Sequence, residues 1–531
     1  MATNNDTNAS GAVYWDPYRP DIAANPYPVY RRLRDEAPLY YNKEHDFYAV
    51  TRFADVDRCL VDTKTFSSAR GDVLEFIKAN MEIPPGMFIW EDPPEHTAYR
   101  NVVARVFTPK RMNELEQQIR DYCVRCLDPV AGADRIDFIA DLGAKLPGGV
   151  IGMLLGIPDE DRDLVRERVD TALRTEAGKP MTVEQASYQG EGFEEYIDWR
   201  EKNPSNDLMT ELLNVQFQDA KGIMRKLTRD EILIFVNVLA GAGNETTARL
   251  IGWMGKVLSD NPDQRREIAK NPALIPAAVE EVLRVEPPGT QVGRYVTQDV
   301  EIHGQIVPAG SVMQFILAAA NRDERRFPDG DRFNIHREGP PHITFGRGIH
   351  SCLGSALARV EGRVALDELL KRFPDWEVDL DNAKLSSSST TRGWDTLPAF
   401  VGTGRRPAKT QPKVETAPAA EAPAAPAIAP RDTPLEGEWI VTVHSPTGPM
   451  ETRLLLERKD GELTGSQSGE GSTSPILEAS FDNGNIVWTN RITKPMKLKL
   501  EFSGVVDGNT MSGKVKTGFM GSFKFTGVKA A

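Results

Sequence analysis

The chain has 531 residues, 40% of them hydrophobic and 27% charged, which is typical of a globular protein but too long for one ordinary hydrophobic core. We therefore expect at least two domains. The net charge of −13 argues against nucleic acid and anionic membrane surfaces as partners. From residue 435 onward, eleven acidic and eleven basic residues balance, so the whole negative excess lies before that point.

The N-terminus, which begins Met1-Ala-Thr-Asn, lacks the basic and apolar regions of a signal peptide. No apolar run approaches the ~20 residues of a membrane helix, and the longest candidate, residues 232–243, is interrupted by Asn237. Four cysteines in the whole chain predict a reducing compartment without a disulfide framework. Together these features predict a cytoplasmic protein with no membrane anchor.

Two early segments have helical patterns. In residues 95–100, His96 and Arg100 are four residues apart and so share one helix face. A second helix is expected over residues 112–127, where Cys123 and Cys126 form a C-x-x-C. No second cysteine pair completes a zinc site, so we interpret both as ordinary helix thiols.

A long helical pattern further along contains residues 238–249, Val-Leu-Ala-Gly-Ala-Gly-Asn-Glu-Thr-Thr-Ala-Arg. Its Gly-Ala-Gly run costs helix stability, so a compensating use is expected. The alternative is a packing face whose Thr246 bonds back to its own helix. In the next helical segment, Glu281 and Arg284 are neighbours on one face, and Pro287-Pro288 ends that helix. Arg294 follows this turn.

The segment around Cys352 is the most informative part of the chain. It reads Phe345-Gly-Arg-Gly-Ile-His350-Ser-Cys-Leu-Gly354, and a helical pattern over residues 355–371 follows it. Glycines let the backbone pass close to a large group, while a helix N-terminus and nearby cations favour a thiolate. The alternative is a small buried cysteine in a turn.

The composition changes after residue 406. Seven prolines among many alanines between Pro407 and Pro434 predict an extended spacer that cannot form a core. Beyond it, roughly eight short strands alternate with turn pairs such as Asp507-Gly508. This pattern indicates an up-and-down antiparallel barrel or strongly curled sheet, and resembles a small lipocalin-like module.

The cysteine segment resembles the haem-ligand loop of the cytochromes P450, Phe-Gly-x-Gly-x-His-x-Cys-x-Gly, at all six fixed positions. The motif in residues 242–247 resembles the oxygen-binding segment of the same family, with Glu in place of the commoner Asp. The resemblance covers approximately residues 15–404. It implies a mainly α fold with small β sheets, followed by the separate all-β domain. The expected domains are residues 1–406 (haem domain), 407–434 (linker) and 435–531 (β domain).

The resemblance implies a role for each motif around haem b. Cys352 would be the iron ligand in a loop shaped by Phe345 and Gly354, and Glu245 with Thr246 would deliver protons to dioxygen. Glu281 and Arg284 would form the family's structural Glu-x-x-Arg pair. The cations expected at the haem propionates are His96, Arg100, Arg294 and His350.

The implied function is a haem-thiolate monooxygenase that inserts one oxygen atom into a hydrophobic small molecule, such as a terpene, steroid or fatty-acyl compound. Apolar residues in four segments would line the substrate site: 84–90, 239–243, 289–292 and 394–397. No dinucleotide fingerprint and no cysteine occur after residue 404, so a separate ferredoxin and reductase would supply electrons from NAD(P)H. Arg347, Arg359 and Arg363 would either face this partner or form a solvated surface.

Three other hypotheses stay open at this point. The same site could carry out P450-type desaturation, C–C cleavage or coupling. The chain could be a haem-binding protein without turnover, against which the intact Glu245-Thr246 pair argues. The β domain, which has no catalytic cluster, could act as a docking or ligand-binding module, or as the surface through which the chain forms oligomers.

Overall fold

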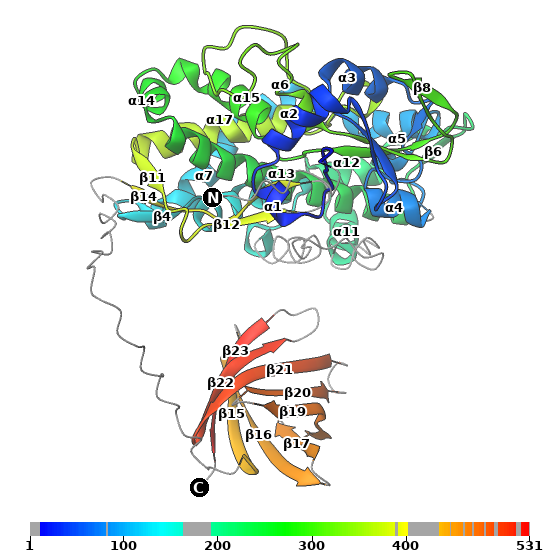
Figure 1. Ribbon diagram of the computed structural model, residues 1–531. Helices are drawn as coiled ribbons and strands as arrows, with labels where there is room; N and C mark the ends of the chain where they lie inside the picture. Colours follow the sequence, from blue (N-terminus) through cyan, green and yellow to red (C-terminus); the bar gives the residue numbers. More distant parts are fainter. Residues whose placement is uncertain are drawn as a thin grey trace. The chain divides into compact units, whose positions relative to one another are not determined.

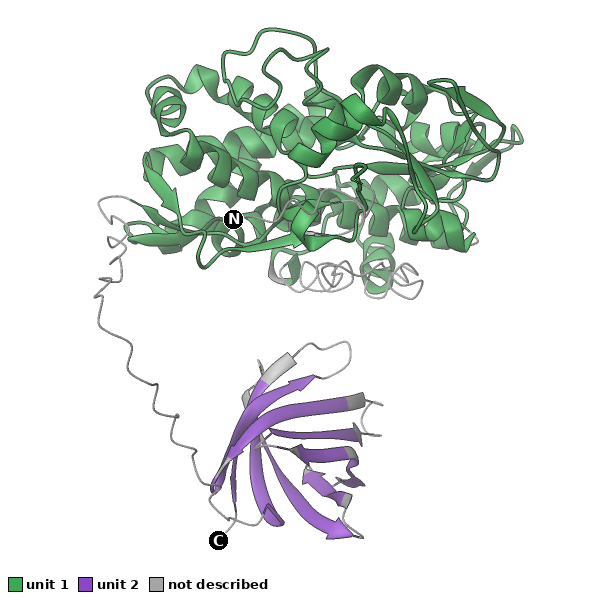
Figure 2. Ribbon diagram, in the orientation of Figure 1, with its two compact units in different colours: residues 1–410 green, residues 411–531 purple. Residues whose placement is uncertain are grey.

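The structure is a computed structural model that describes residues 11–80, 83–162, 193–387 and 391–401 of the first part of the chain. In the second part it describes residues 435–445, 448–459, 462–469, 472–482, 485–492, 498–516 and 522–529. The chain divides into two compact units, residues 1–410 (unit 1) and 411–531 (unit 2), which Figure 2 colours separately. The predicted linker, residues 407–434, lies outside the described residues, so its boundaries stay a prediction.

Unit 1 is mainly helical (Figure 1). Its α-helices are α1 (Pro20–Ala24), α2 (Tyr27–Glu36), α3 (Phe53–Val61), α4 (Leu74–Ala79), α5 (Glu95–Ala104), α6 (Pro109–Glu114), α7 (Glu116–Leu127), α8 (Leu146–Leu155), α11 (Glu194–Lys202), α12 (Leu208–Asn214), α13 (Arg229–Asp260), α14 (Pro262–Lys270), α15 (Ile275–Val285), α16 (Leu317–Ala320) and α17 (Ser355–Arg372). Short 3-10 or π turns are η1 (Phe88–Trp90), η2 (Asp128–Val130), η3 (Phe138–Gly143), η4 (Asp159–Asp161), η5 (Pro272–Leu274) and η6 (Gly348–His350).

Small sheets flank these helices. The largest has the order β1-β2-β10-β7-β3, in which only β10 and β2 are parallel. Its strands are β1 (Leu39–Asn42), β2 (Phe47–Val50), β3 (Phe66–Ser67), β7 (Val292–Val296) and β10 (Val312–Phe315). The others are β4 (Arg135–Asp137), β5 (Gln216–Gln218), β6 (Met224–Lys226), β8 (Val300–Ile302), β9 (Gln305–Val307), β11 (Trp376–Val378), β12 (Lys384–Ser387), β13 (Arg392–Thr396) and β14 (Pro398–Val401).

The central element is α13, which runs through the interior of unit 1 (Figure 1). A capping box begins it, in which Thr228 accepts from the Glu231 backbone and Glu231 accepts from the Thr228 backbone. Gly255 lets another element approach closely, since a Cβ there would lie 2.7 Å from the Phe138 ring. Burial over most of its length explains why a helix with two glycines near its middle is stable.

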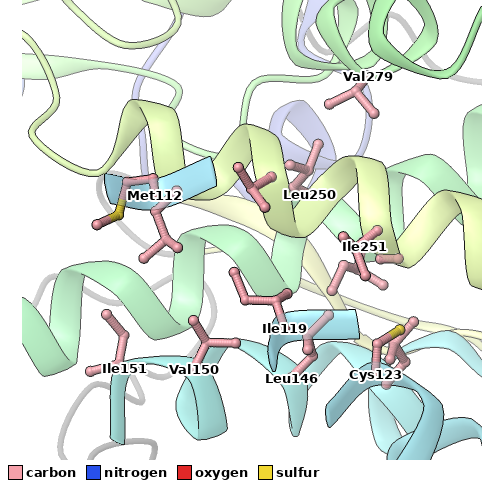
Figure 3. Packing of buried hydrophobic residues seen from close by; sticks show 14 of the residues in the cluster. Met112, Ile119, Cys123, Leu146, Val150, Ile151, Leu250, Ile251 and Val279 are labelled. Atoms are coloured by element: carbon pink, nitrogen blue, oxygen red, sulfur yellow. The ribbon is translucent and has the colours of Figure 1, made fainter. Parts of the chain in front are cut away.

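The core of unit 1 lies between α13 and the helices around it. Figure 3 shows this packing, to which side chains of α6, α7, α8, α13 and α15 contribute. Cys123 and Cys126 are both buried, and burial raises the pKa of the Cys123 thiol well above its usual value. The helix expected over residues 112–127 is in fact two helices, α6 and α7, which meet at Leu115.

One apolar stretch was missed in the sequence. Phe138–Leu155 is 18 residues long with a mean hydropathy of 1.4, enough by length and composition alone to cross a membrane. It combines η3 with α8, and 61% of it is buried inside unit 1. A core helix of a soluble protein passes the same test, so this stretch is weak evidence for a membrane span.

Unit 2 is one antiparallel sheet of nine strands that curls on itself, with the order β18-β17-β16-β15-β23-β22-β21-β20-β19. Its strands are β15 (Gly437–Ser445), β16 (Gly448–Lys459), β17 (Glu462–Gly469), β18 (Ser472–Pro475), β19 (Leu477–Asp482), β20 (Asn485–Ile492), β21 (Leu498–Asp507), β22 (Thr510–Lys516) and β23 (Ser522–Lys529). The prediction of a separate, lipocalin-like all-β region is confirmed.

Buried side chains of this sheet pack together in one hydrophobic cluster. Trp488 stacks on Phe502, with ring centroids 4.4 Å apart and an interplanar angle of 5°. Beside this stack, the buried Gln467 side-chain oxygen accepts hydrogen bonds from Trp488 and Asn490, both at 3.1 Å. Between β21 and β22, Asp507 pairs with Thr510 across a turn in which Gly508 has a φ of +59°, as the Asp-Gly pair predicted.

Candidate active site

The Cys352 loop connects η6 to the N-terminus of α17. The Cys352 backbone N–H donates to the Phe345 carbonyl at 2.7 Å and closes the loop. Gly346 and Gly348 have φ values of +67° and +71°, a region that disfavours every residue with a side chain. The two glycines therefore form the turn that places the cysteine directly ahead of the helix, which begins at Ser355 as predicted.

Cys352 is the one exposed cysteine among the four. Burial by surrounding protein atoms nevertheless raises the pKa of its thiol, while the backbone N–H of Gly354 and the cations of Arg100 and Arg359 oppose that rise. The helix N-terminus and the nearby cations therefore favour the thiolate, as expected, although the surrounding protein atoms outweigh them. A metal ion bound by the sulfur would favour the thiolate further.

The structure brings the four predicted propionate-binding residues together around this loop. His96 and Arg100 lie on α5, Arg294 lies on β7, and His350 ends η6. The rings of His96 and His350 have centroids 4.2 Å apart, and Arg100 donates to the Ser351 carbonyl next to the cysteine. Burial lowers the pKa of His96 to about 4, with a further contribution from Arg100.

Asp92 lies close enough to this cluster to oppose the lowering of the pKa of His96 and Arg294, but burial outweighs it at both residues. Burial, Arg294 and His96 lower the pKa of His350 to about 3, because positive groups face one another here. Both ring nitrogens of His96, and Nε2 of His350, are buried without a hydrogen-bond partner among the described residues. Unpaired buried donors beside two arginines fit a ligand that carries carboxylates. The residues present therefore fit haem, whose two propionates would meet this cluster while its iron meets Cys352.

The middle of α13 contributes the predicted oxygen-binding segment. Ala242 is exposed although it lies in the central helix of the unit, as expected for a residue that faces a space for a ligand. The Thr246 hydroxyl donates to the Ala242 carbonyl at 2.8 Å, which is the back-bonded arrangement considered as the alternative. The Glu245 carboxylate accepts from Thr391 and Arg249. The i,i+4 spacing could have indicated Arg249, whereas no local pattern indicates Thr391.

Glu281 and Arg284 form a buried ion pair with two parallel contacts of 2.8 Å. Arg284 also donates to the Asn321 carbonyl at 2.8 Å. The Asn321 side chain accepts from the Ile343 backbone and donates to Thr344 just before the cysteine loop, at 2.9 and 2.8 Å. The pair is thus connected to the loop through Asn321, a residue with no signal in the sequence.

The four expected substrate-lining segments differ in their exposure. Phe88 is buried against Phe235 at 5.1 Å between centroids, and Trp394 packs against Trp253 at 5.4 Å. These aromatic side chains belong to the core, because their rings find partners there. Ile89 and Trp90 are partly exposed, as is part of the 239–243 stretch.

The fold and the site together define a mainly helical haem-thiolate protein. Comparison with known proteins identifies its family. The family model described as cytochrome P450 matches residues 270–397. A putative cytochrome P450 123 from Mycobacterium tuberculosis is 36% identical over 396 residues, covering 73% of this chain and 96% of the relative. The chain belongs to the cytochrome P450 family, and it is a P450 monooxygenase.

Two further similarities agree with this assignment. Vitamin D(3) 25-hydroxylase from Pseudonocardia autotrophica is 35% identical over 384 residues, which cover 71% of this chain and 94% of that enzyme. The solved structure of cytochrome P450 CYP109Q5 from Chondromyces apiculatus aligns with a TM-score of 0.65 and 34% identity, covering 73% of this chain and 98% of that structure. The fold class predicted from the sequence is therefore confirmed.

Proposed function

We propose that this P450 oxidises a hydrophobic small molecule of the terpene, steroid or fatty-acyl type, with electrons from NAD(P)H through a separate ferredoxin and reductase. The observation that supports this proposal is the cluster of His96, His350, Arg100 and Arg294 beside Cys352, in which buried imidazole nitrogens have no hydrogen-bond partner among the described residues and so fit the propionates of haem b. When bound, haem supplies the activation of dioxygen, with the overall balance RH + O2 + NAD(P)H + H⁺ → ROH + H2O + NAD(P)⁺.

The protein's own residues hold and orient this chemistry in the proposal. Cys352 is the iron ligand, in the loop formed by Phe345, His350 and Gly354. His96, Arg100 and Arg294 join His350 in binding the propionates, since each is a cation or a donor for a carboxylate. Glu245 and Thr246 move protons from solvent toward the haem face.

The substrates and ligands in the names of related proteins support this substrate class. One relative is a vitamin D(3) 25-hydroxylase, and the structure of CYP109E1 from Bacillus megaterium, 29% identical with a TM-score of 0.65, contains testosterone. P450BioI, 28% identical with a TM-score of 0.63, was solved with hexadec-9Z-enoic acid ligated to an acyl carrier protein. All three molecules are large and mainly apolar, which agrees with the substrate class proposed here.

The electron donor would dock on the side of the cysteine loop. Arg347 is half exposed there and pairs with Asp57 at 3.1 Å, while Arg359 pairs with Glu280. Ion pairs that are this exposed contribute little to stability, so both arginines can exchange partners at little cost.

The reduced protein with carbon monoxide tests the haem assignment. Wild type should absorb near ~450 nm, the signature of thiolate ligation, and Cys352→His should lose this band. Cys59→Ala, at a buried cysteine far along the chain from the loop, should keep it. A colourless wild type after expression with ample haem would overturn the proposal. A screen of terpenes, steroids and fatty acids for a shift of the haem spin state would then identify the substrate class.

A further inference from the structure

The Glu245 carboxylate is held through one of its two oxygens. Oε1 accepts from the Thr391 hydroxyl at 3.0 Å and from Arg249 Nη2 at 3.2 Å. Among the residues that the structure describes, no hydrogen bond reaches Oε2. The side chain is 24% exposed, so the second oxygen is accessible to water although the residue lies in the middle of α13. The two oxygens of one carboxylate thus have different environments.

Thr391 reaches Glu245 because β13 packs tightly against α13. A Cβ on Gly393 would lie 2.4 Å from the Arg249 Cδ, so only glycine permits this approach. Thr391 itself forms an isolated antiparallel bridge with Gly289, and the next residue's backbone N–H donates to the Pro288 carbonyl at 2.9 Å. Two contacts with the 288–289 segment therefore fix the backbone that carries the Thr391 hydroxyl.

Arg249 is itself anchored on the same hairpin. Its Nη1 donates to the Trp394 carbonyl and to Asp395 Oδ1, the latter at 3.1 Å. Asp395 pairs in turn with Lys384, which is 74% exposed, at 3.1 Å. An arginine does not give up its proton in proteins, so this chain of ion pairs cannot carry protons inward. It can only fix the position of the Glu245 carboxylate.

We propose that Thr391 and Arg249 are positioning residues for proton delivery, which pin Glu245 through Oε1 and leave Oε2 as the oxygen that exchanges protons. Oε2 takes a proton from water and passes it toward Thr246 and the haem face, while the bonds at Oε1 stay in place. The inference rests on the proposed role of Glu245. It adds that the hairpin of β12 and β13, far along the chain from α13, determines the orientation of the acid.

The first test measures where electrons go, in full-length haem-loaded protein supplied with a surrogate ferredoxin, its reductase and NADH, without organic substrate. One NADH is used per dioxygen that ends as hydrogen peroxide, and two NADH are used per dioxygen that ends as water. Efficient proton delivery to the haem face favours water over hydrogen peroxide as the product of dioxygen reduction. Thr391→Val, which keeps the shape and removes the hydroxyl, should raise peroxide per NADH at least about threefold.

Two matched variants accompany this measurement. Thr391→Ser keeps the hydroxyl and should restore the wild-type ratio of peroxide to NADH. Thr297→Val removes a hydroxyl that bonds to the carbonyls of Lys64 and Thr65 on the surface, and should leave the ratio unchanged. If Thr391→Val matches wild type, or if Thr391→Ser fails to restore the ratio, the proposal is wrong.

The second test is independent of turnover. A double-mutant cycle of Thr391→Val and Glu245→Ala, which removes the accepting carboxylate, should give a coupling of about tenfold to a hundredfold in the urea-unfolding equilibrium constant, as expected for a hydrogen bond to a charged group. Additive effects would contradict the contact. The band near ~450 nm distinguishes a failure of the proposed function from a failure of this inference alone. If wild type lacks it, the proposed function fails; if every variant keeps it and the ratios do not change, only this inference fails.

Discussion

The imidazole rings of His96 and His350 lie with centroids 4.2 Å apart, although one belongs to an early helix and the other to the cysteine loop. Their unpaired nitrogens point to a shared anionic ligand. His96→Gln should therefore weaken haem retention. A lost hydrogen bond to a charged group costs about 1.5–3 kcal/mol, so haem should transfer to apomyoglobin about tenfold to a hundredfold faster. Glu95→Gln, at the exposed neighbouring position, should transfer haem at the wild-type rate.

The buried pair of Glu281 and Arg284 predicts a large loss of stability. Their side chains are 5% and 3% exposed, and lysine cannot reproduce the two parallel contacts of the guanidinium. Arg284→Lys should lower the free energy of unfolding by about 3–5 kcal/mol and reduce haem content. Urea unfolding and the haem absorbance per protein measure both effects. Arg266→Lys, in an exposed pair with Asp263, should cost less than about 1 kcal/mol.

Thr246 provides a prediction on coupling. Thr246→Ala should keep haem and the band near ~450 nm, because among the described residues the hydroxyl bonds to its own helix. It should waste reducing equivalents as hydrogen peroxide, since the proposed relay from Glu245 is interrupted. Thr246→Ser should behave closer to wild type. Tight coupling of NADH use to water or product in Thr246→Ala would count against the relay.

Glu361 on α17 predicts an unusual pH dependence. Burial raises its pKa to about 8, and its Oε2 has no hydrogen-bond partner among the described residues. Between about pH 4.5 and 8 the native state keeps this proton and the unfolded state loses it, so stability should fall by up to about 1.4 kcal/mol per pH unit as pH rises.

Glu361→Gln should remove this slope. Its free energy of urea unfolding should exceed that of wild type by about 2–4 kcal/mol near pH 7.5, and by less than about 1 kcal/mol near pH 5. Glu114→Gln, at an exposed position, is the matched control. Equal pH slopes for wild type and Glu361→Gln would show that the carboxyl is ionised in the folded protein.

Removal of everything after Gly404 tests the independence of unit 2. A related P450 aligns over 96% of its own length to only 73% of this chain. The remaining part of this chain therefore has no counterpart in that relative. The shortened chain should keep the band near ~450 nm, the thermal midpoint of the haem unit and the coupling to NADH. A lower haem content or a changed coupling would assign unit 2 a part in the chemistry.

Local patterns in the sequence were sufficient to identify the elements that carry the site. The glycines around Cys352, the i,i+4 pair of His96 and Arg100, and the helix that ends before Pro287 are local features, and local backbone preferences determine them. The alternating pattern after residue 435 likewise predicted the sheet of unit 2, because alternation has the same period as a pleated strand.

Contacts between distant segments could only come from the tertiary structure. Thr391 bonds to Glu245, and Asn321 joins Arg284 to the cysteine loop, through side chains that no local pattern marks. The net pKa shift of Cys352 also depends on how many atoms surround the thiol, which charge alone did not reveal. Sequence determined which chemical groups this protein has, whereas packing decided which of them are buried, paired or left open for a ligand.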